Sequence, residues 1–233
     1  MTNYSKETAD ETIERLITYS ERLYQSVTQA KVLYACFQSL NENKELRTLI
    51  AKTPAASASN ILMHAALREL MLILVRVFDR AGHSGIEKSD KVTFPIIAEW
   101  LARAPIRAAL IDRARNWFED GYLADKNEAT VTAAMDDIHA RLDRLRSEQP
   151  NREKLLRNFR DGFLAHELHR EVPHDPPLFG HIGEMLEEIR QLSEATSLAI
   201  RGTEIAWEPL DDQITRSADW LWHRVGESDP ARP

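Results

Sequence analysis

The stretch LLRNFRDGFLAH, residues 155–166, combines apolar residues at spacings of three and four with a small cluster of polar groups. That spacing predicts one amphipathic helix with a buried stripe. In such a helix Arg160 and His166 lie about 120° apart and about 9 Å along the axis. Both side chains can therefore flank one cleft, with Arg160 and Asp161 at the boundary between core and water.

The residue types in this stretch suit work on a phosphate ester. The planar guanidinium of Arg160 is a good phosphate ligand, and the imidazole of His166 can titrate close to neutral pH. Asp161 lies next to the arginine and can orient either group. A purely structural alternative stays open, in which Arg160 and Asp161 join a salt-bridge network and His166 caps a helix end.

The residues upstream predict three further helices. Thr8 or Asp10 can cap a long first helix with an apolar stripe to about Leu40, and a short helix follows over 45–52. Residues 60–80, capped by Ser57 or Ser59, are apolar nearly all round, which is typical of a helix at the centre of a fold. Arg76 and Asp79 stand at i and i+3 near its end and can pair with each other.

The rest of the chain also has helical periodicity. We expect helices over 93–103, from Pro105 to about Tyr122, over 125–148, from Pro150 to about Arg170, over 179–202 and around 210–225. A narrow stripe in the 125–148 helix, which fits a seam with one neighbour, consists of Val131, Met135, Ile138, Leu142 and Leu145. With no alternating run of strand length, the sequence predicts a single all-α domain over 1–233, a bundle of long antiparallel helices with a C-terminal helical tail, frayed over 226–233.

Composition limits the function classes. The chain has 233 residues and a net charge of −7, which argues against a general nucleic-acid coat but leaves room for a local basic cleft. One cysteine, Cys36, cannot form an internal disulfide and fits a reducing cytoplasm. The apolar run 61–78 is interrupted by Arg68, Glu69 and Arg76, so we expect a core helix and no membrane span. The N-terminus is polar and carries no apolar signal core.

The spacing of Arg160, Asp161 and His166 resembles the Arg-polar-x4-His motif of the HEPN superfamily. The segments 67–70 and 74–80 look like the second helix of its AbiU2-like branch, and 90–97 is similar to that branch's short connecting helix. The resemblance spans roughly residues 10 to 200.

The resemblance implies a metal-independent endoribonuclease, acting as a toxin or in phage defence, with a composite site at a homodimer interface. His166 would then be the general acid or base, Arg160 would hold the scissile phosphate and Asp161 would orient them. The residues expected to support this site or contact RNA are Arg157, Arg76, Asp79 and His169. It implies no cofactor and no metal, and allows an antitoxin or nucleotidyltransferase partner.

Two other functions fit the residues. A non-catalytic helical adaptor could use the tryptophans of the tail and the narrow seam of the 125–148 helix to bind a partner. A metal site could form from a crowded set of possible ligands, namely His166, Glu167, His169, His174, Asp175 and His181. His166 and His169 share a helix face, but their spacing lacks one residue of the zinc-protease motif.

Overall fold

A computed structural model describes residues 8–83, 85–118, 121–147, 154, 157–158 and 179–227. Within these ranges every regular element is a helix and no strand occurs, so the all-α prediction is confirmed. The helices are α1 (Ala9–Glu42), α2 (Lys44–Ile50), α3 (Ala56–Arg76), the 3₁₀ turn η1 (Ile86–Lys88), α4 (Phe94–Leu101), α5 (Ala104–Arg115), α6 (Ala124–Ser147), α8 (Phe179–Arg201) and α9 (Trp207–Gly226).

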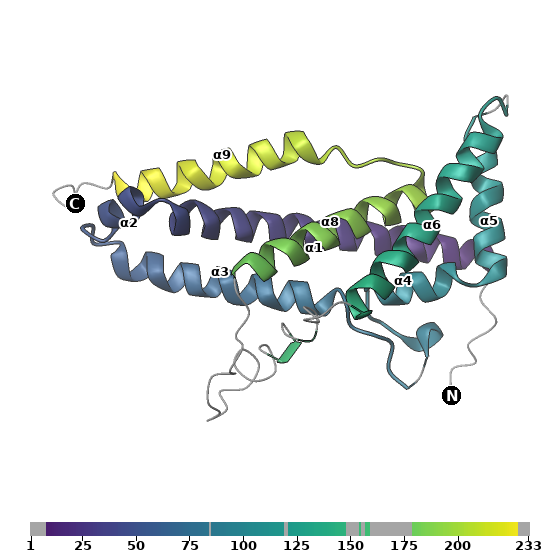
Figure 1. The fold of residues 1–233 in the computed structure, drawn as a ribbon, viewed down its shortest axis with the longest axis horizontal. Coiled ribbons are helices and arrows are strands. Elements are labelled where there is room, and N and C mark those ends of the chain that lie inside the picture. The colour runs from purple at the N-terminus through teal and green to yellow at the C-terminus, as the bar shows by residue number, and fades with distance from the viewer. Residues whose placement is uncertain are drawn as a thin grey trace.

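Helix α1 is the long axis of the molecule, and Figure 1 shows α3, α8 and α9 lying along it while α5 and α6 stand at one end. Thr8 caps α1 as predicted: its hydroxyl accepts a hydrogen bond from the Glu11 N–H at 3.2 Å, and the Glu11 carboxylate accepts one from the Thr8 N–H at 2.8 Å. This reciprocal pair satisfies two amide groups that the first helical turn leaves without partners.

Helix α3 forms one wall of the core but begins and ends earlier than the sequence predicts. It spans 56–76 rather than 60–80, and Ala55 precedes it without a side-chain cap, so the prediction of a cap at Ser57 or Ser59 is wrong. The inward face of its second half is fully buried, as Leu70, Met71, Ile73 and Leu74 show. Its first half exposes Ile61 and Leu62 by 67% and 61%, so only part of α3 is central.

Helices α6 and α8 pack against each other through apolar faces closed by ion pairs. The predicted stripe of α6 is buried throughout, but it faces α4 and α5 as well as α8, so it is core rather than a seam with one neighbour. Glu188 of α8 receives two hydrogen bonds from Arg144 at 2.6 and 2.8 Å and lies 3.6 Å from Arg141. Helix α8 ends at Gly202, whose φ of +66° and contact with the Trp117 ring leave no room for a side chain.

The C-terminal helix α9 lies along α1 and closes the opposite side of the molecule from α3. Trp207 and Trp222 are buried, and the Trp222 Nε1–H donates to the carbonyl of Cys36 at 2.8 Å. The expected set of exposed tail tryptophans is therefore wrong except for Trp220, which is 62% exposed. Cys36 is half-buried, and burial raises the pKa of its thiol, which disfavours the thiolate form that a nucleophile needs.

Some further predictions need correction or lie outside the described residues. The helix from Pro105 ends at Arg115, not near Tyr122. The helix expected from Pro150 to about Arg170 lies outside the described ranges except for residues 154 and 157–158, and residues 228–233 of the expected frayed tail also lie outside them. In the part of the chain that the structure describes, α3 is long and apolar enough to suit a membrane crossing, a test that a buried core helix also passes.

Candidate functional site

The structure describes part of the predicted site. Arg157, Arg76 and Asp79 lie within the described residues, whereas Arg160, Asp161, His166 and His169 lie outside them. The site is therefore built here from the residues around Arg157 and Asp79, which the sequence analysis named as supporting or RNA-contacting residues.

Asp79 follows the C-terminal end of α3 and connects that end to the segment that carries the motif. Its Oδ1 accepts a hydrogen bond from Arg157 Nη1 at 3.1 Å, and its Oδ2 lies 4.0 Å from Lys91 Nζ. Asp79 and Arg157 side chains are 23% and 32% exposed, so this ion pair is partly shielded from water. The carboxylate thus holds residues 157–158 beside the end of α3.

The predicted pairing of Arg76 with Asp79 is wrong. Arg76 occupies the last turn of α3 and is exposed, while the chain leaves the helix at Val77 and turns the Asp79 carboxylate toward Arg157 and Lys91. Among the described residues, Arg76 makes no hydrogen bond or ion pair with its side chain. Its guanidinium is therefore available to an anion from solution.

A polar pocket of about 510 Å³ opens beside Asp79, between α1, the end of α3 and the segment 90–93. It contains three cations, two carboxylates and several uncharged donors and acceptors; the full lining is Arg22, Gln25, Ser26, Gln29, Arg76, Asp79, Asp90, Lys91, Val92 and Thr93. Arg22, like Arg76, has no ion-pair partner among the described residues. Two free guanidinium groups and two amides suit a ligand that combines phosphate with hydrogen-bonding edges.

The segment that forms the outer wall of this pocket is fixed at several points. Lys91 Nζ donates to the Arg80 carbonyl at 3.1 Å, the Phe94 N–H donates to the Val77 carbonyl at 3.0 Å, and the Tyr19 hydroxyl approaches the Ser89 carbonyl at 3.5 Å. Thr93 then caps α4 by accepting from the Ile96 N–H. These contacts keep Lys91 and Asp90 in place next to Asp79, so the pocket is preformed.

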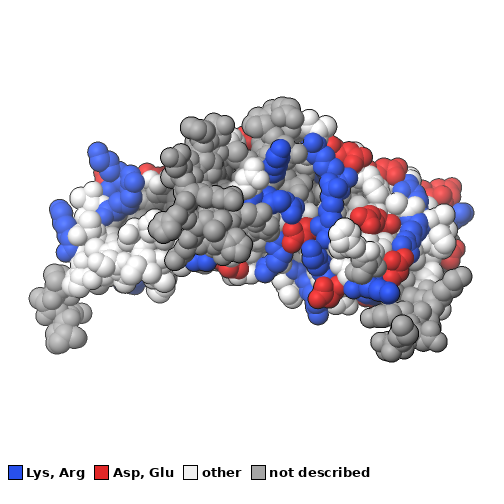
Figure 2. Space-filling model, turned by 90° about the horizontal axis from the view of Figure 1, so that it is seen from below, with Lys and Arg blue, Asp and Glu red and all other residues white. Residues whose placement is uncertain are grey.

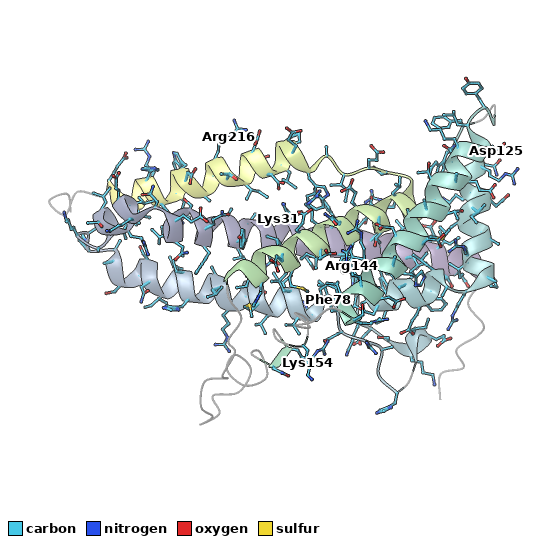
Figure 3. The ribbon with its side chains drawn as sticks, in the orientation of Figure 1. Lys31, Phe78, Asp125, Arg144, Lys154 and Arg216 are labelled. Atoms are coloured by element: carbon cyan, nitrogen blue, oxygen red, sulfur yellow. The ribbon has the colours of Figure 1, made fainter. Side chains whose placement is uncertain are left out.

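Basic residues gather around this region of the surface. Figure 2 shows Lys and Arg side chains on the lower face, interspersed with fewer acidic ones. Three arginines close to the motif in the sequence form ion pairs: Arg144 with Glu188, Arg146 with Asp143 and Arg157 with Asp79. Figure 3 shows Lys154 below the end of α3, where Phe78 is buried in the core.

The sequence analysis did not identify Arg22, Gln25, Gln29 and Lys91 as site residues. Three of them recur at intervals of three and four on α1, which is a detectable polar stripe. The sequence could not show that this stripe faces the end of α3, because that contact depends on how α1 and α3 pack against each other.

The described residues do not test the metal alternative. They contain no group of three or more His, Cys, Asp and Glu side chains placed to hold an ion. Of the six residues considered as ligands, His181 is described, and the others lie outside the described ranges.

A comparison with protein-family models matches residues 13–220 to the HEPN family described as AbiU2. No curated protein and no solved structure matches the chain. The matched range includes α1 through most of α9, together with the motif segment 155–166. The chain therefore belongs to the AbiU2 family of HEPN domains.

Proposed function

We propose that this protein is a metal-independent endoribonuclease that works as a homodimer in the cytoplasm, as a toxin or in phage defence. The observation that supports it is the ion pair of Asp79 with Arg157 at 3.1 Å beside a pocket with two unpaired arginines. Arg157 precedes Arg160 by three residues, so the pocket adjoins the segment that carries the motif. An antitoxin or nucleotidyltransferase partner is part of this proposal.

The proposed chemistry uses the RNA's own nucleophile. The ribose 2′-hydroxyl loses its proton and attacks the adjacent phosphorus, the bond from phosphorus to the 5′ oxygen breaks, and that oxygen takes a proton. His166 carries one of these protons, and Arg160 binds the phosphate as negative charge builds on it. Arg22, Arg76 and Lys91 would hold neighbouring phosphates of a single strand.

The homodimer is supported by the exposed side of α3. Ile61, Leu62, Ala58 and Ala65 form an apolar helix face at the surface, in the half of α3 that the core leaves uncovered. Large exposed apolar side chains in contiguous positions are typical of interaction sites. A second copy of the same face is the simplest partner, because an isologous contact needs no other protein.

The test is cleavage of a labelled single-stranded RNA in EDTA by the full-length protein. Wild type should cleave, whereas His166→Ala and Arg160→Ala should lose at least about 100-fold in rate, in line with the loss of one acid–base or oxyanion group. Arg146→Gln is the matched control, since Arg146 is paired with Asp143 at the surface. An RNA with 2′-deoxyribose at the cleaved position should resist.

Mixing the two inactive variants tests the composite site. A shared cleft built from two chains should regain partial activity in the mixed dimer, whereas two separate sites should stay inactive. Activity that disappears in EDTA would favour the metal-site alternative. Protein that binds the RNA tightly and never cleaves it would favour the non-catalytic adaptor.

A further inference from the structure

A second pocket lies at the other end of α3, away from the candidate ribonuclease site. Ser59, Met63 and Leu67 continue, at spacings of three and four, the same helix face that Leu70 and Leu74 bury further along. Helix α8 starts beside the middle of α3 and covers its second half (Figure 1). The first half of that face therefore opens into a pocket of about 400 Å³.

The walls of this pocket are mostly apolar, and helix α9 packs against the residues that form one of them. Phe37 and Leu40 of α1 form one wall, and Ile50 with Ala51 at the end of α2 forms another. On the far side of that wall, Trp222 of α9 packs with Leu40, Leu46 and Ile50 in a second apolar cluster. The indole of Trp222 is also hydrogen-bonded to α1 at Cys36. These contacts hold α1 and α2 against α9.

The polar groups of the pocket select for a negative charge. Its lining contains one arginine, Arg47, one histidine, His64, and two amides, Asn41 and Asn60, but no Asp or Glu. In the described part of the chain Arg47 makes no ion pair. An unpaired guanidinium at the edge of an apolar cavity complements a carboxylate attached to an apolar chain.

We propose that this pocket binds an amphipathic monocarboxylate with an unbranched chain of roughly eight to twelve carbons. The volume holds about a dozen non-hydrogen atoms if each takes about the 30 Å³ of a liquid water molecule. The alkyl chain lies against Phe37, Leu40, Met63 and Leu67, and the carboxylate meets Arg47. This site is independent of RNA cleavage, because it uses none of the residues of the polar pocket.

The head-group half of the proposal is tested by calorimetric titration of the full chain with decanoate and with decanol, both as monomers in solution. Decanoate should bind with one molecule per chain, at least about tenfold more tightly than decanol, because a hydrogen-bonded charge is lost in the alcohol. Arg47→Gln should remove that preference. Lys44→Gln is the matched control, because Lys44 is a cation on the same helix that does not line the pocket.

The tail half is tested by filling the pocket. Met63→Trp should abolish decanoate binding, and Leu62→Trp, a neighbouring substitution on the exposed side of α3, should leave it unchanged. If Met63→Trp unfolds the chain, Ala56→Leu narrows the pocket at the helix start and should weaken decanoate at least severalfold. The proposal is wrong if wild type does not bind decanoate, or if Met63→Trp and Arg47→Gln both bind decanoate as tightly as wild type does. If wild type forms a dimer but does not bind decanoate, and Met63→Trp dissociates that dimer, then a second copy of the chain fills the pocket.

Discussion

Both halves of α3 carry large apolar side chains, but those side chains have opposite surroundings. In the second half, Ile73 and Leu74 are fully buried, and the helix ends at a polar pocket organised by Asp79. In the first half, Ile61 and Leu62 are mostly exposed, and the inward face lines an apolar pocket. The comparison teaches that one apolar helix can be core along one half and remain partly exposed along the other.

The largest expected effect is the difference in stability between matched substitutions in the two halves. Ile73→Ala should lower the free energy of unfolding by about 2–5 kcal/mol, because it leaves a cavity in packed surroundings. Ile61→Ala should change it by about 0.5 kcal/mol or less, because the side chain is 67% exposed. Urea denaturation of both variants measures the difference.

If Ile73→Ala and Ile61→Ala lower the free energy of unfolding equally, the two halves of α3 do not differ in burial in solution. It would mean that Ile61 is buried there, and the proposed homodimer supplies a reason. Repeating the Ile61→Ala measurement at a tenfold lower protein concentration separates the two cases, because stability gained from a dimer falls on dilution.

The second prediction concerns the contact at the buried end of α3. A double-mutant cycle with Asp79→Asn and Arg157→Gln should give a coupling free energy of about 1 kcal/mol, because both side chains are mostly shielded. The control cycle uses Glu14→Gln and Arg113→Gln, a 3.5 Å pair whose side chains are 70% and 48% exposed. Its coupling should be about 0.3 kcal/mol or less. Similar values in the two cycles would mean that Asp79 does not anchor Arg157 more firmly than an ordinary surface pair.

Much of the fold could be predicted because periodicity and capping are local properties. Thr8, Asn43 and Thr93 each accept a hydrogen bond from the amide three residues ahead, and each begins a helix near the predicted place. The cap at Ser57 or Ser59 failed for an equally local reason, since α3 starts earlier and Ser59 is buried within it.

The site could be predicted less well because it depends on contacts between distant segments. The sequence analysis identified Asp79 and Arg157 but predicted that Asp79 pairs with Arg76, three residues before it on the expected helix. The actual partner lies 78 residues away, and its choice depends on where α3 ends and how the following segment turns. The same limit applies to Arg22 and Gln25, whose stripe on α1 is visible while the surface it faces is not.

The smallest expected effect concerns the loop that shapes the polar pocket. Glu87 in η1 is bound by Arg103, whose guanidinium also lies 4.2 Å from the centre of the Trp100 ring. The hydrogen bond from Arg103 is the main reason that the pKa of Glu87 lies below its ordinary value of 4.5. A lowered pKa in the folded state stabilises the fold above pH 4.5, and this contribution disappears as the pH falls through the folded-state pKa.

Wild type should therefore be more stable than Glu87→Gln at pH 7, by about 0.5 kcal/mol or less for so exposed a pair. The difference should shrink as the pH falls below 4.5, and urea denaturation of both proteins over a series of pH values from 7 downward measures it. A difference that grows on acidification would require Glu87 to have a raised pKa, and the loop that places Lys91 beside Asp79 would then need another anchor.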